Sequence, residues 1–411
     1  MATNTAAATP RKALICGAGI SGLALAHRLD ALGWEVVVLE KARGPRTQGY
    51  MIDFFGPGYE AAERMGLLAR MRDMSYRIEE AAFLDAHGRS RAALSYAQFE
   101  KVTGGRMFST MRPDLERALR EQLGERVELR YGTGPAAVTD SADGVRVTLA
   151  DGTAHEADLL VGADGIHSTV RELVFGPEER YLRPLGFHTA AYTFADEAVH
   201  ARVRDGFRLT DTIGRQMGFY ALRDGRVAAF AVHRTDDTTL PDDARAALRE
   251  EYGSLGWVVP RALAACPPHE EIYYDQVAQT VLPRWHSGRT VLLGDACGAV
   301  SLLAGQGASL GIAGAWVLGG HLDGAPDPAE GMERYESEWR PVVEDKQEVA
   351  RKGARWFLPA SPLQLRARHL MARLSRIPGV DRRIAAALTG KATPLGPEPR
   401  PNALSGVARD A

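Results

Sequence analysis

The stretch RKALICGAGISGLALAHRLDALGWEVVVLEK, residues 11–41, decides the fold class. It reads as a strand, a tight glycine turn, a helix and a second strand that ends at Glu40. The turn carries the pattern G-x-G-x-x-G at Gly17, Gly19 and Gly22. Such a unit holds the pyrophosphate of a dinucleotide on the helix N-terminus, and the acid accepts hydrogen bonds from a ribose. The stretch therefore predicts a dinucleotide site, although Lys41 beside Glu40 does not separate NADP from FAD.

Composition narrows the class of protein further. The chain has 411 residues, 45% of them hydrophobic and 25% charged, which allows two or three globular domains. A formal net charge of -2 argues against a nucleic-acid binder. The 3 cysteines lie far apart in apolar settings, which favours neither a disulfide framework nor a zinc site and fits a reducing cytoplasm. No signal peptide or membrane span is expected.

One carboxylate stands out in VLLGDACGAVSLLAGQGASLGIAGAWVLGG, residues 291–320. Asp295 is the one charged residue of this stretch, and it follows a strand-like run and precedes a glycine-rich turn and an apolar helix. Two interpretations stay open. Asp295 could cap the helix that follows, or it could bind a flat ligand whose polar edge meets this backbone.

Two further segments carry charged groups where ligands bind. Arg112 opens the helix pattern RPDLERALREQLG and so places a cation at the positive end of the helix dipole, a cost that a nearby anion would remove. After a predicted hairpin at residues 151–152, the strand ADLLVGADG ends in Asp164 and Gly165. The next helix carries Ser168 and Arg171 in its first turns. The carboxyl end of such a strand is where doubly wound sheets bind ligands.

From about residue 180 to 283 the pattern changes to alternating strands with a hairpin at residues 224–225. This indicates a sheet-rich domain inserted into the first one. Alternation predicts that Arg215, Met217 and Phe219 share one face of a strand. They are candidate substrate residues, although alternation does not say whether this face points to the substrate or to the core.

Taken together, five segments carry a resemblance: GAGISG, VVVLEKARGPRTQGYMIDFFGPG, MRPDLERAL, LLVGADGIHSTVR and WHSGRTVLLGDACGAVSLLAGQGASL. In this order they resemble the class A flavoprotein monooxygenases, single-component FAD enzymes with a p-hydroxybenzoate-hydroxylase-like fold. The resemblance covers about residues 11–345. Within the family, RTQGYMIDF and AGQGASLG are similar to the tetracycline-inactivating and aromatic-polyketide-tailoring branch.

The resemblance implies an α/β fold with a Rossmann-like FAD-binding domain of the GR2 type, an inserted mixed β-sheet substrate domain and C-terminal helices. We expect a disordered tail (1–10), a discontinuous FAD-binding domain (11–179 plus 284–345), a substrate-binding domain (180–283), C-terminal helices (346–395) and a flexible tail (396–411).

The same resemblance implies a set of cofactor-binding residues: Gly17, Gly19, Ile20, Ser21, Gly22, Glu40, Lys41, Arg43, Arg46, Asp53, Arg112, Asp164, Gly165, Gly294, Asp295, Gly305, Gln306, Gly307 and Ala308. Arg43 would lie near the adenine, and Arg46 and Asp53 near the flavin ring and NADPH. Asp295 would accept hydrogen bonds from ribityl or ribose hydroxyls of FAD. The helix that starts near Gln306 would aim its positive end at the flavin.

The implied reaction needs no protein nucleophile, because the cofactor carries the chemistry. NADPH or NADH reduces FAD, O2 forms a C4a-(hydro)peroxyflavin, and one oxygen atom passes to an aromatic or polyketide-like small molecule. We interpret His167 as structural. The loop with Leu302 and Gly305 would lie near the peroxide. Relatives have a histidine at Gly298 and a proline at Ser301–Leu302, so this loop lacks the fixed φ of proline.

Other classes of protein also bind dinucleotides or flavins. An NAD-dependent dehydrogenase would not explain the GADG and GDA segments, and the tryptophans never form the W-x-W-x-I-P pattern of flavin-dependent halogenases. A flavin-dependent NAD(P)H oxidase or a non-catalytic flavin- or drug-binding protein stays open. We expect a cytoplasmic monomer or weak dimer.

Overall fold

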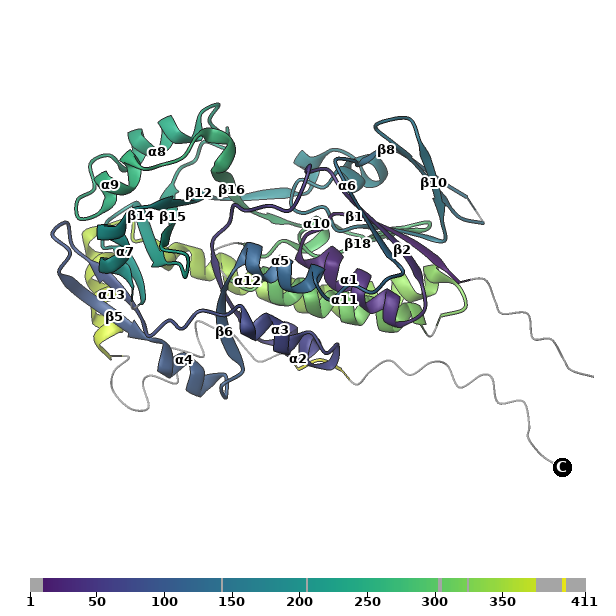
Figure 1. The fold of residues 1–411 in the computed structure, drawn as a ribbon, viewed down its shortest axis with the longest axis horizontal. Coiled ribbons are helices and arrows are strands. Elements are labelled where there is room, and N and C mark those ends of the chain that lie inside the picture. Colours follow the sequence, from purple (N-terminus) through teal and green to yellow (C-terminus); the bar gives the residue numbers. More distant parts are fainter. Residues whose placement is uncertain are drawn as a thin grey trace, which may run out of the picture.

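Two β-sheets dominate the fold, and a long C-terminal helix runs beside both (Figure 1). The computed structural model describes residues 10–141, 143–204, 206–301, 305–323, 325–374 and 394–396. The mixed α/β class expected from the sequence is confirmed.

The first sheet has six strands and forms the dinucleotide half. Its strands in spatial order are β17 (His286–Ser287), β18 (Thr290–Leu292), β11 (Leu159–Gly162), β1 (Lys12–Cys16), β2 (Glu35–Glu40) and β7 (Val127–Tyr131). β1 pairs in parallel with both neighbours, so that Cys16 lies opposite Gly162 and Leu39. The carboxyl ends of β1, β2 and β11 therefore meet at one edge, where parallel α/β sheets bind ligands.

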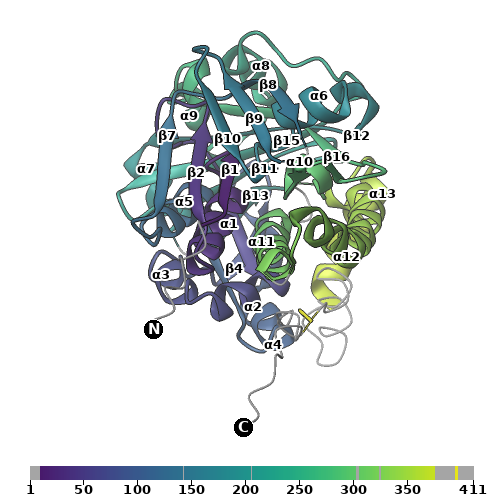
Figure 2. The ribbon, with the colours of Figure 1, turned by 90° about the vertical axis from the view of Figure 1, so that its right-hand side faces the viewer.

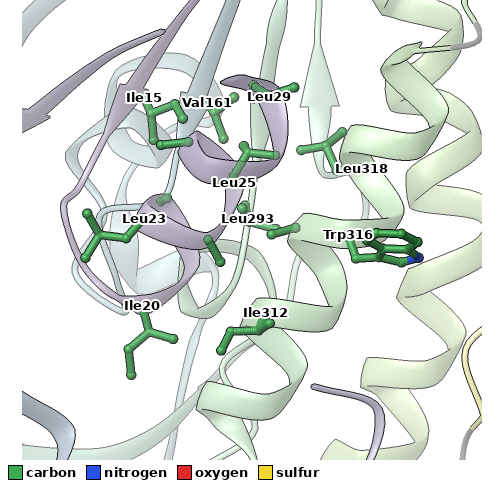
Figure 3. Packing of buried hydrophobic residues seen from close by; sticks show 14 of the residues in the cluster. Ile15, Ile20, Leu23, Leu25, Leu29, Val161, Leu293, Ile312, Trp316 and Leu318 are labelled. Atoms are coloured by element: carbon green, nitrogen blue, oxygen red, sulfur yellow. The ribbon is translucent and has the colours of Figure 1, made fainter. Parts of the chain in front are cut away.

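Helix α1 (Ile20–Ala31) packs between this sheet and α11 (Gly307–Asp323), as Figure 3 shows around Leu25, Ile312 and Leu318. Glycines make this close packing possible. A Cβ on Gly311 would lie 2.3 Å from Ser21 Oγ, and a Cβ on Gly319 would lie 2.5 Å from Arg28 Cγ. Part of the small-residue run that the sequence shows after Asp295 is thus explained by helix packing.

Several shorter elements complete this half. They are α2 (Pro57–Arg64), α3 (Leu68–Asp73), α5 (Arg112–Arg120), α6 (Thr169–Phe175), the 3₁₀ helix η1 (Glu178–Arg180), α10 (Asp295–Gly298), the two-stranded ribbon of β3 (Met51–Phe55) and β6 (Met107–Met111), and a three-stranded sheet of β8 (Pro135–Asp140), β9 (Val145–Leu149) and β10 (Ala154–Ala157). β9 and β10 pair antiparallel around residues 151–152, which confirms the predicted hairpin.

The second sheet has seven strands. In spatial order they are β16 (Tyr273–Thr280), β12 (Leu182–Ala195), β15 (Arg226–Arg234), β14 (Arg215–Ala221), β13 (Gly206–Thr210), β4 (Glu80–Leu84) and β5 (Ser90–Ser95). β14 and β15 form the predicted hairpin. One face is covered by α7 (Glu197–Val203), α8 (Ala244–Tyr252) and α9 (Val259–Ala264). Two other short helices are α4 (Tyr96–Val102) and η2 (His269–Glu271).

The second sheet draws strands from outside residues 180–283. β4 pairs in parallel with β13 and carries β5 at the sheet edge, so residues 80–95 belong to this sheet and not, as expected, to the FAD-binding half. The expected border between residues 345 and 346 falls inside α12 (Pro328–Phe357), a continuous helix.

Figure 2 looks along α11 and α12, which lie side by side beside the first sheet. α12 continues to the second sheet, where Ala354 packs in a cluster with Phe187, Val232 and Val277. Helix α13 (Pro362–Leu374) follows, and residues 375–393 of the expected C-terminal helices lie outside the described residues. So do residues 1–9 and 397–411 of the two expected tails. Among the described helices, none combines the length and the apolar character needed to cross a membrane.

Candidate functional site

The glycine turn after β1 shapes the first of two adjoining cavities, which has a volume of ≈ 350 Å³. Gly17 has φ +111°, and a Cβ there would lie 2.3 Å from the carbonyl oxygen of Ala163. A Cβ on Gly22 would lie 2.0 Å from the carbonyl oxygen of Gly17, whereas the atom nearest to a Cβ on Gly19 would be 3.7 Å away. Gly17 and Gly22 therefore hold the turn against the sheet, and Gly19 leaves the first turn of α1 open to a phosphate.

Glu40 ends β2 beside this turn. Its carboxylate accepts hydrogen bonds from the Ala18 amide at 3.0 Å and the Ala42 amide at 2.9 Å. Arg46 Nη2 lies 3.7 Å from Glu40 Oε1, and Lys41 and Arg46 both line the cavity. The acid is thus fixed where the sequence predicts a ribose acceptor, with cationic groups beside it.

A second cavity of ≈ 150 Å³ continues from the first, and Gly19, Arg112, Ala163 and Gly165 line both. The predicted residues that line the second cavity are Gly19, Ile20, Ser21, Arg112, Gly165, Asp295, Gly305, Gly307 and Ala308. Other parts of its wall come from the β3 ribbon, from β12 and β16 of the second sheet, and from the segments after β11 and α10. One groove therefore runs from the glycine turn to the second sheet.

Arg112 stands where the two cavities meet. Its guanidinium lies 2.8 Å from Glu116 Oε1, one helical turn further along α5. Burial lowers the pKa of Arg112, but Glu116, two tyrosines and Asp295 raise it more, so the side chain stays charged. Glu116 therefore supplies a negative charge that offsets Arg112 at the start of α5. The side of the guanidinium that lines the groove is left for a ligand.

Asp295 is exposed to the second cavity and deep in the protein at the same time. Burial raises the pKa of its carboxyl, and Arg112 lowers it. Gly294, not Asp295, is the N-cap of α10, and no side chain caps this helix. Within the described part of the chain, no donor is hydrogen-bonded to the Asp295 carboxylate. Since this holds for the described amides at the start of α11 as well, the structure gives the helix-cap interpretation no support, and the carboxylate is open to a ligand hydroxyl.

Helix α11 begins at Gly307, close to the predicted start. A Cβ on Gly307 would lie 3.6 Å from Asp295 Oδ1, so the helix N-terminus opens directly beside the carboxylate. The free amides of the first turn carry a partial positive charge. The second cavity thus offers an acceptor and a donor end side by side.

Both carboxylate oxygens of Asp164 accept hydrogen bonds from other groups of the protein. Oδ1 accepts a hydrogen bond from Ser168 Oγ at 2.5 Å, and Oδ2 accepts one from the Val170 amide at 3.0 Å. Burial raises the pKa of Asp164. Asp164 lines the first cavity, as predicted, but these bonds give it a structural task at the start of α6 as well.

Arg171 holds the loops around the groove together, although it was not among the predicted site residues. Its guanidinium is fully buried and donates to the carbonyl oxygens of Ala296 at 3.1 Å and Ile166 at 2.8 Å. It also donates to Glu178 Oε2 at 2.7 Å. The loop after β11 and the start of α10 are thereby held in one arrangement.

His167 extends this network to the second sheet. Its Nδ1 lies 2.9 Å from Glu178 Oε1 and its Nε2 lies 3.1 Å from Asp275 Oδ1. The hydrogen bond to Asp275 raises the pKa of His167 to about 9 against the opposing effect of partial burial, and Glu178 adds to the rise. His167 is therefore charged at neutral pH, and its contacts agree with a structural role.

The raised pKa makes stability depend on pH. An unfolded histidine titrates near pH 6.5, so the His167 contribution is complete below about pH 6.5 and is lost as the pH rises through about 9. We expect His167→Gln to lower the free energy of unfolding by about 1 kcal/mol at pH 6, a modest figure because solvent screens this half-exposed group. Denaturant unfolding of the variant and wild type from pH 6 to 10 measures the difference, which should shrink with pH. The exposed His87, replaced by Gln, is the control; a pH-independent difference at His167 contradicts the assignment.

Several predicted residues lie outside the groove. Arg43 is exposed and does not line either cavity, and Gln306 is buried directly before α11. Asp53 accepts hydrogen bonds from Ser109 Oγ at 2.5 Å and Tyr96 OH at 2.9 Å, on the ribbon face that points away from the groove.

Two predicted glycines are needed for packing. A Cβ on Gly22 would lie 2.0 Å from the carbonyl oxygen of Gly17, and a Cβ on Gly294 would lie 2.3 Å from Ser21 Oγ. Leu302 lies outside the described residues.

The predicted substrate residues Arg215, Met217 and Phe219 lie on the face of β14 that is covered by α8 and α9. Met217 and Phe219 are fully buried in the cluster beneath α8 and α9, and Arg215 Nη1 donates to the carbonyl oxygen of Glu251 in α8. Side chains of a strand alternate, so Gln216, Gly218 and Tyr220 take the face towards the ribbon, where Tyr220 packs with Met51 and Met111. The shared face was predicted correctly, but it belongs to the core.

The second sheet contributes a wall of the second cavity that was not predicted from the sequence. Tyr273 and Asp275 of β16 line the second cavity together with Thr189, which lies opposite Asp275 on β12. Tyr50 joins them, and its ring centroid is 5.9 Å from that of Tyr273. Burial raises the pKa of both phenols, so both keep their protons. The alternation in YYDQVAQT, residues 273–280, was the available signal.

The residues present fit FAD. Gly19 lines the groove without a side chain, and a Cβ there would take up space beside Arg112. Glu40 and Asp295 are acceptors at the two ends of the groove, and Arg112 is a cation between them. A dinucleotide with two sets of sugar hydroxyls and a pyrophosphate matches this order of groups.

This fold and this groove define a flavoprotein. The chain belongs to the FAD binding domain family, whose pattern matches residues 11–350, and within it to the class A FAD-dependent monooxygenases. The family expected from the sequence is thus confirmed. Membership implies FAD as cofactor, and a small-molecule substrate and O2 as reactants.

Three similar proteins illustrate the range. The chain is 35% identical over 352 residues to the uncharacterized protein Rv1260 of Mycobacterium tuberculosis (81% of this chain, 91% of that protein). It is 27% identical over 385 residues to the FAD-dependent monooxygenase asL4 of Sarocladium schorii (85% and 89%). The crystal structure of the tetracycline destructase Tet(55) superimposes with a TM-score of 0.79 at 25% identity, covering 94% of this chain and 99% of that one.

Proposed function

We propose that the chain is a single-component monooxygenase that reduces FAD with NAD(P)H and transfers one oxygen atom of O2 to an aromatic or polyketide-like small molecule. The observation that carries this proposal is the single groove that passes from the glycine turn to Asp295 and ends against the second sheet. FAD, when bound, supplies electron transfer and activation of O2. The nicotinamide cofactor would bind only transiently, because the sequence holds no second G-x-G-x-x-G unit for it.

Each protein group has a defined task in this proposal. The first turn of α1 would bind the pyrophosphate, and Glu40 would bind a ribose. Asp295 would accept a hydrogen bond from a ribityl hydroxyl. The N-terminus of α11 would stabilise the negative charge of the reduced flavin ring. Arg112 would hold the middle of the cofactor.

The aromatic side chains where the groove meets the second sheet favour an aromatic substrate. Tyr50 lies between Tyr273 and Phe230, with ring centroids 5.9 Å and 6.1 Å away. Flat rings stack on such walls, and the neutral phenols can donate hydrogen bonds. The names of relatives, a tetracycline destructase among them, agree with a polycyclic substrate. We further propose a cytoplasmic monomer or weak dimer.

The test is a turnover experiment. We expect the purified protein to bind one FAD per chain and to consume NAD(P)H and O2 with an aromatic polyketide, giving a product heavier by one oxygen atom. Mass spectrometry of the product and a peroxide assay measure the outcome. If all reducing equivalents appear as H2O2 with every substrate, the protein is an NAD(P)H oxidase; if NAD(P)H is not consumed, it is a flavin- or drug-binding protein. Tight stoichiometric NAD without flavin would overturn both the cofactor and the reaction.

A further inference from the structure

Two buried glutamines hold the backbone at the wall of the second cavity. Gln279, near the end of β16, is 0% exposed, and Gln347, in α12, is 3% exposed. Both reach the segment Ala299–Val300, which follows α10 and precedes Ser301. Ala299 and Ser301 line the cavity beside Asp295 and Gly305. The glutamines themselves do not line it.

The four amide hydrogens of this pair are all used. Gln279 Nε2 donates to the carbonyl oxygens of Val300 at 2.6 Å and Gln347 at 2.9 Å. Gln347 Nε2 donates to the carbonyl oxygens of Ala299 at 2.9 Å and Thr280 at 2.8 Å. A primary amide has two donor hydrogens, so this arrangement satisfies both side chains. We call Gln279 and Gln347 the glutamine clamp.

Other groups fix the clamp itself. Arg351 Nη1 donates to Gln279 Oε1 at 2.8 Å, and the Thr280 amide donates to the Ala299 carbonyl oxygen at 3.3 Å. Thr280 Oγ1 donates to the Asp295 carbonyl oxygen at 2.9 Å. The whole turn from Asp295 to Val300 is thus bonded to one strand and one helix that come from different parts of the chain.

The residue that follows the clamped segment is strained. Ser301 has φ +131°, a region that residues with a Cβ rarely adopt. Such a conformation persists only where the surroundings over-determine it. The sequence has Ser301 and Leu302 at this point, so no proline ring fixes φ here. The glutamine clamp supplies a restraint from outside the segment.

We propose that Gln279 and Gln347 are positioning residues that hold Ala299–Ser301 at the cavity wall and thereby keep oxygen activation coupled to substrate oxidation. This rests on the proposed function. In the coupled reaction NAD(P)H, H+, O2 and substrate give NAD(P)+, water and the oxygenated substrate. In the uncoupled reaction NAD(P)H, H+ and O2 give NAD(P)+ and H2O2. A segment that moves away from the wall admits water, which favours the second reaction.

The decisive variant is Gln347→Met, which keeps the side-chain volume and removes both donors. In the apoprotein we expect amide hydrogen exchange of Ala299–Ser301 to become about tenfold faster, because two buried hydrogen bonds are lost. In the FAD-loaded enzyme with substrate we expect the H2O2 released per NADPH to rise at least about twofold, while flavin reduction and the FAD Kd stay as in wild type. Arg351→Met, at the outer end of the clamp, should change both quantities in the same direction but less.

The matched control is Gln122→Met, which removes one donor to the carbonyl oxygen of Ala118 at the end of α5, away from the groove. It should alter neither exchange at Ala299–Ser301 nor the H2O2 ratio. Unchanged exchange in folded Gln347→Met overturns the clamp whatever the enzyme does. Faster exchange with an unchanged H2O2 ratio overturns the coupling role. If no NAD(P)H is consumed by wild type, the function fails instead and the coupling role falls with it, whereas exchange in the apoprotein still decides whether the clamp restrains the segment.

Discussion

Replacing Asp295 by alanine is expected to weaken FAD binding ten- to a hundredfold and to leave the melting temperature of the apoprotein nearly unchanged. The lost charge-assisted hydrogen bond to a sugar hydroxyl has a free energy of about 1.5–3 kcal/mol, which is one to two decades in Kd. Stability should not fall, because no described donor is bonded to this carboxylate and its burial is already unfavourable, as its raised pKa shows. Titration of the apoprotein with FAD, beside thermal melts without FAD, measures both quantities.

Asp164→Asn is the matched comparison. Both of its carboxylate oxygens accept hydrogen bonds within the protein, so this variant should melt earlier even without FAD. Asp295→Asn should fall between wild type and Asp295→Ala in FAD affinity, since it keeps an acceptor but loses the charge. A large drop in apoprotein stability with retained flavin in Asp295→Ala would return that residue to a purely structural role.

Arg171→Met should be the most destabilising single change among those considered. It removes a fully buried cation and takes one donor from Glu178 Oε2 and from each of the carbonyl oxygens of Ile166 and Ala296. Each buried acceptor left without a donor costs about 1–3 kcal/mol. Urea unfolding of the apoprotein measures the loss.

FAD affinity should fall as well in Arg171→Met, because the loops that carry Gly165 and Asp295 lose their common anchor. Arg180→Met, an exposed arginine of the same region, should stay within about 0.5 kcal/mol of wild type. If the two variants proved equally stable, the buried network around Arg171 would contribute nothing to holding the groove.

Local signals predicted the dinucleotide half well. The glycine turn, Glu40, Arg112, Asp164 and Asp295 all lie at strand or helix ends, where a short sequence window fixes both conformation and position. The groove follows from these ends because parallel strands bring them to one edge.

Long-range pairing could not be predicted in the same way. β4 joins the second sheet through β13, more than a hundred residues later, and no periodicity in residues 80–84 encodes that partner. Alternation placed Met217 and Phe219 on one face but could not say which face looks towards the flavin half, since both faces of this sheet are largely buried. Arg171 and the glutamine clamp act through backbone carbonyls, which leave no trace in the sequence.

Helix α12 has a mechanical consequence. Its 30 residues span about 45 Å, and it packs against the first core near Tyr335 and Trp339 and against the second sheet near Ala354. Because one helix packs against both halves, we expect the halves to move together and not as independent bodies. Pro341 removes one hydrogen bond of the rod and marks the place where bending would concentrate. We therefore expect small molecules to enter and leave the groove through local motion of its loops, which a crosslink along α12 would not hinder.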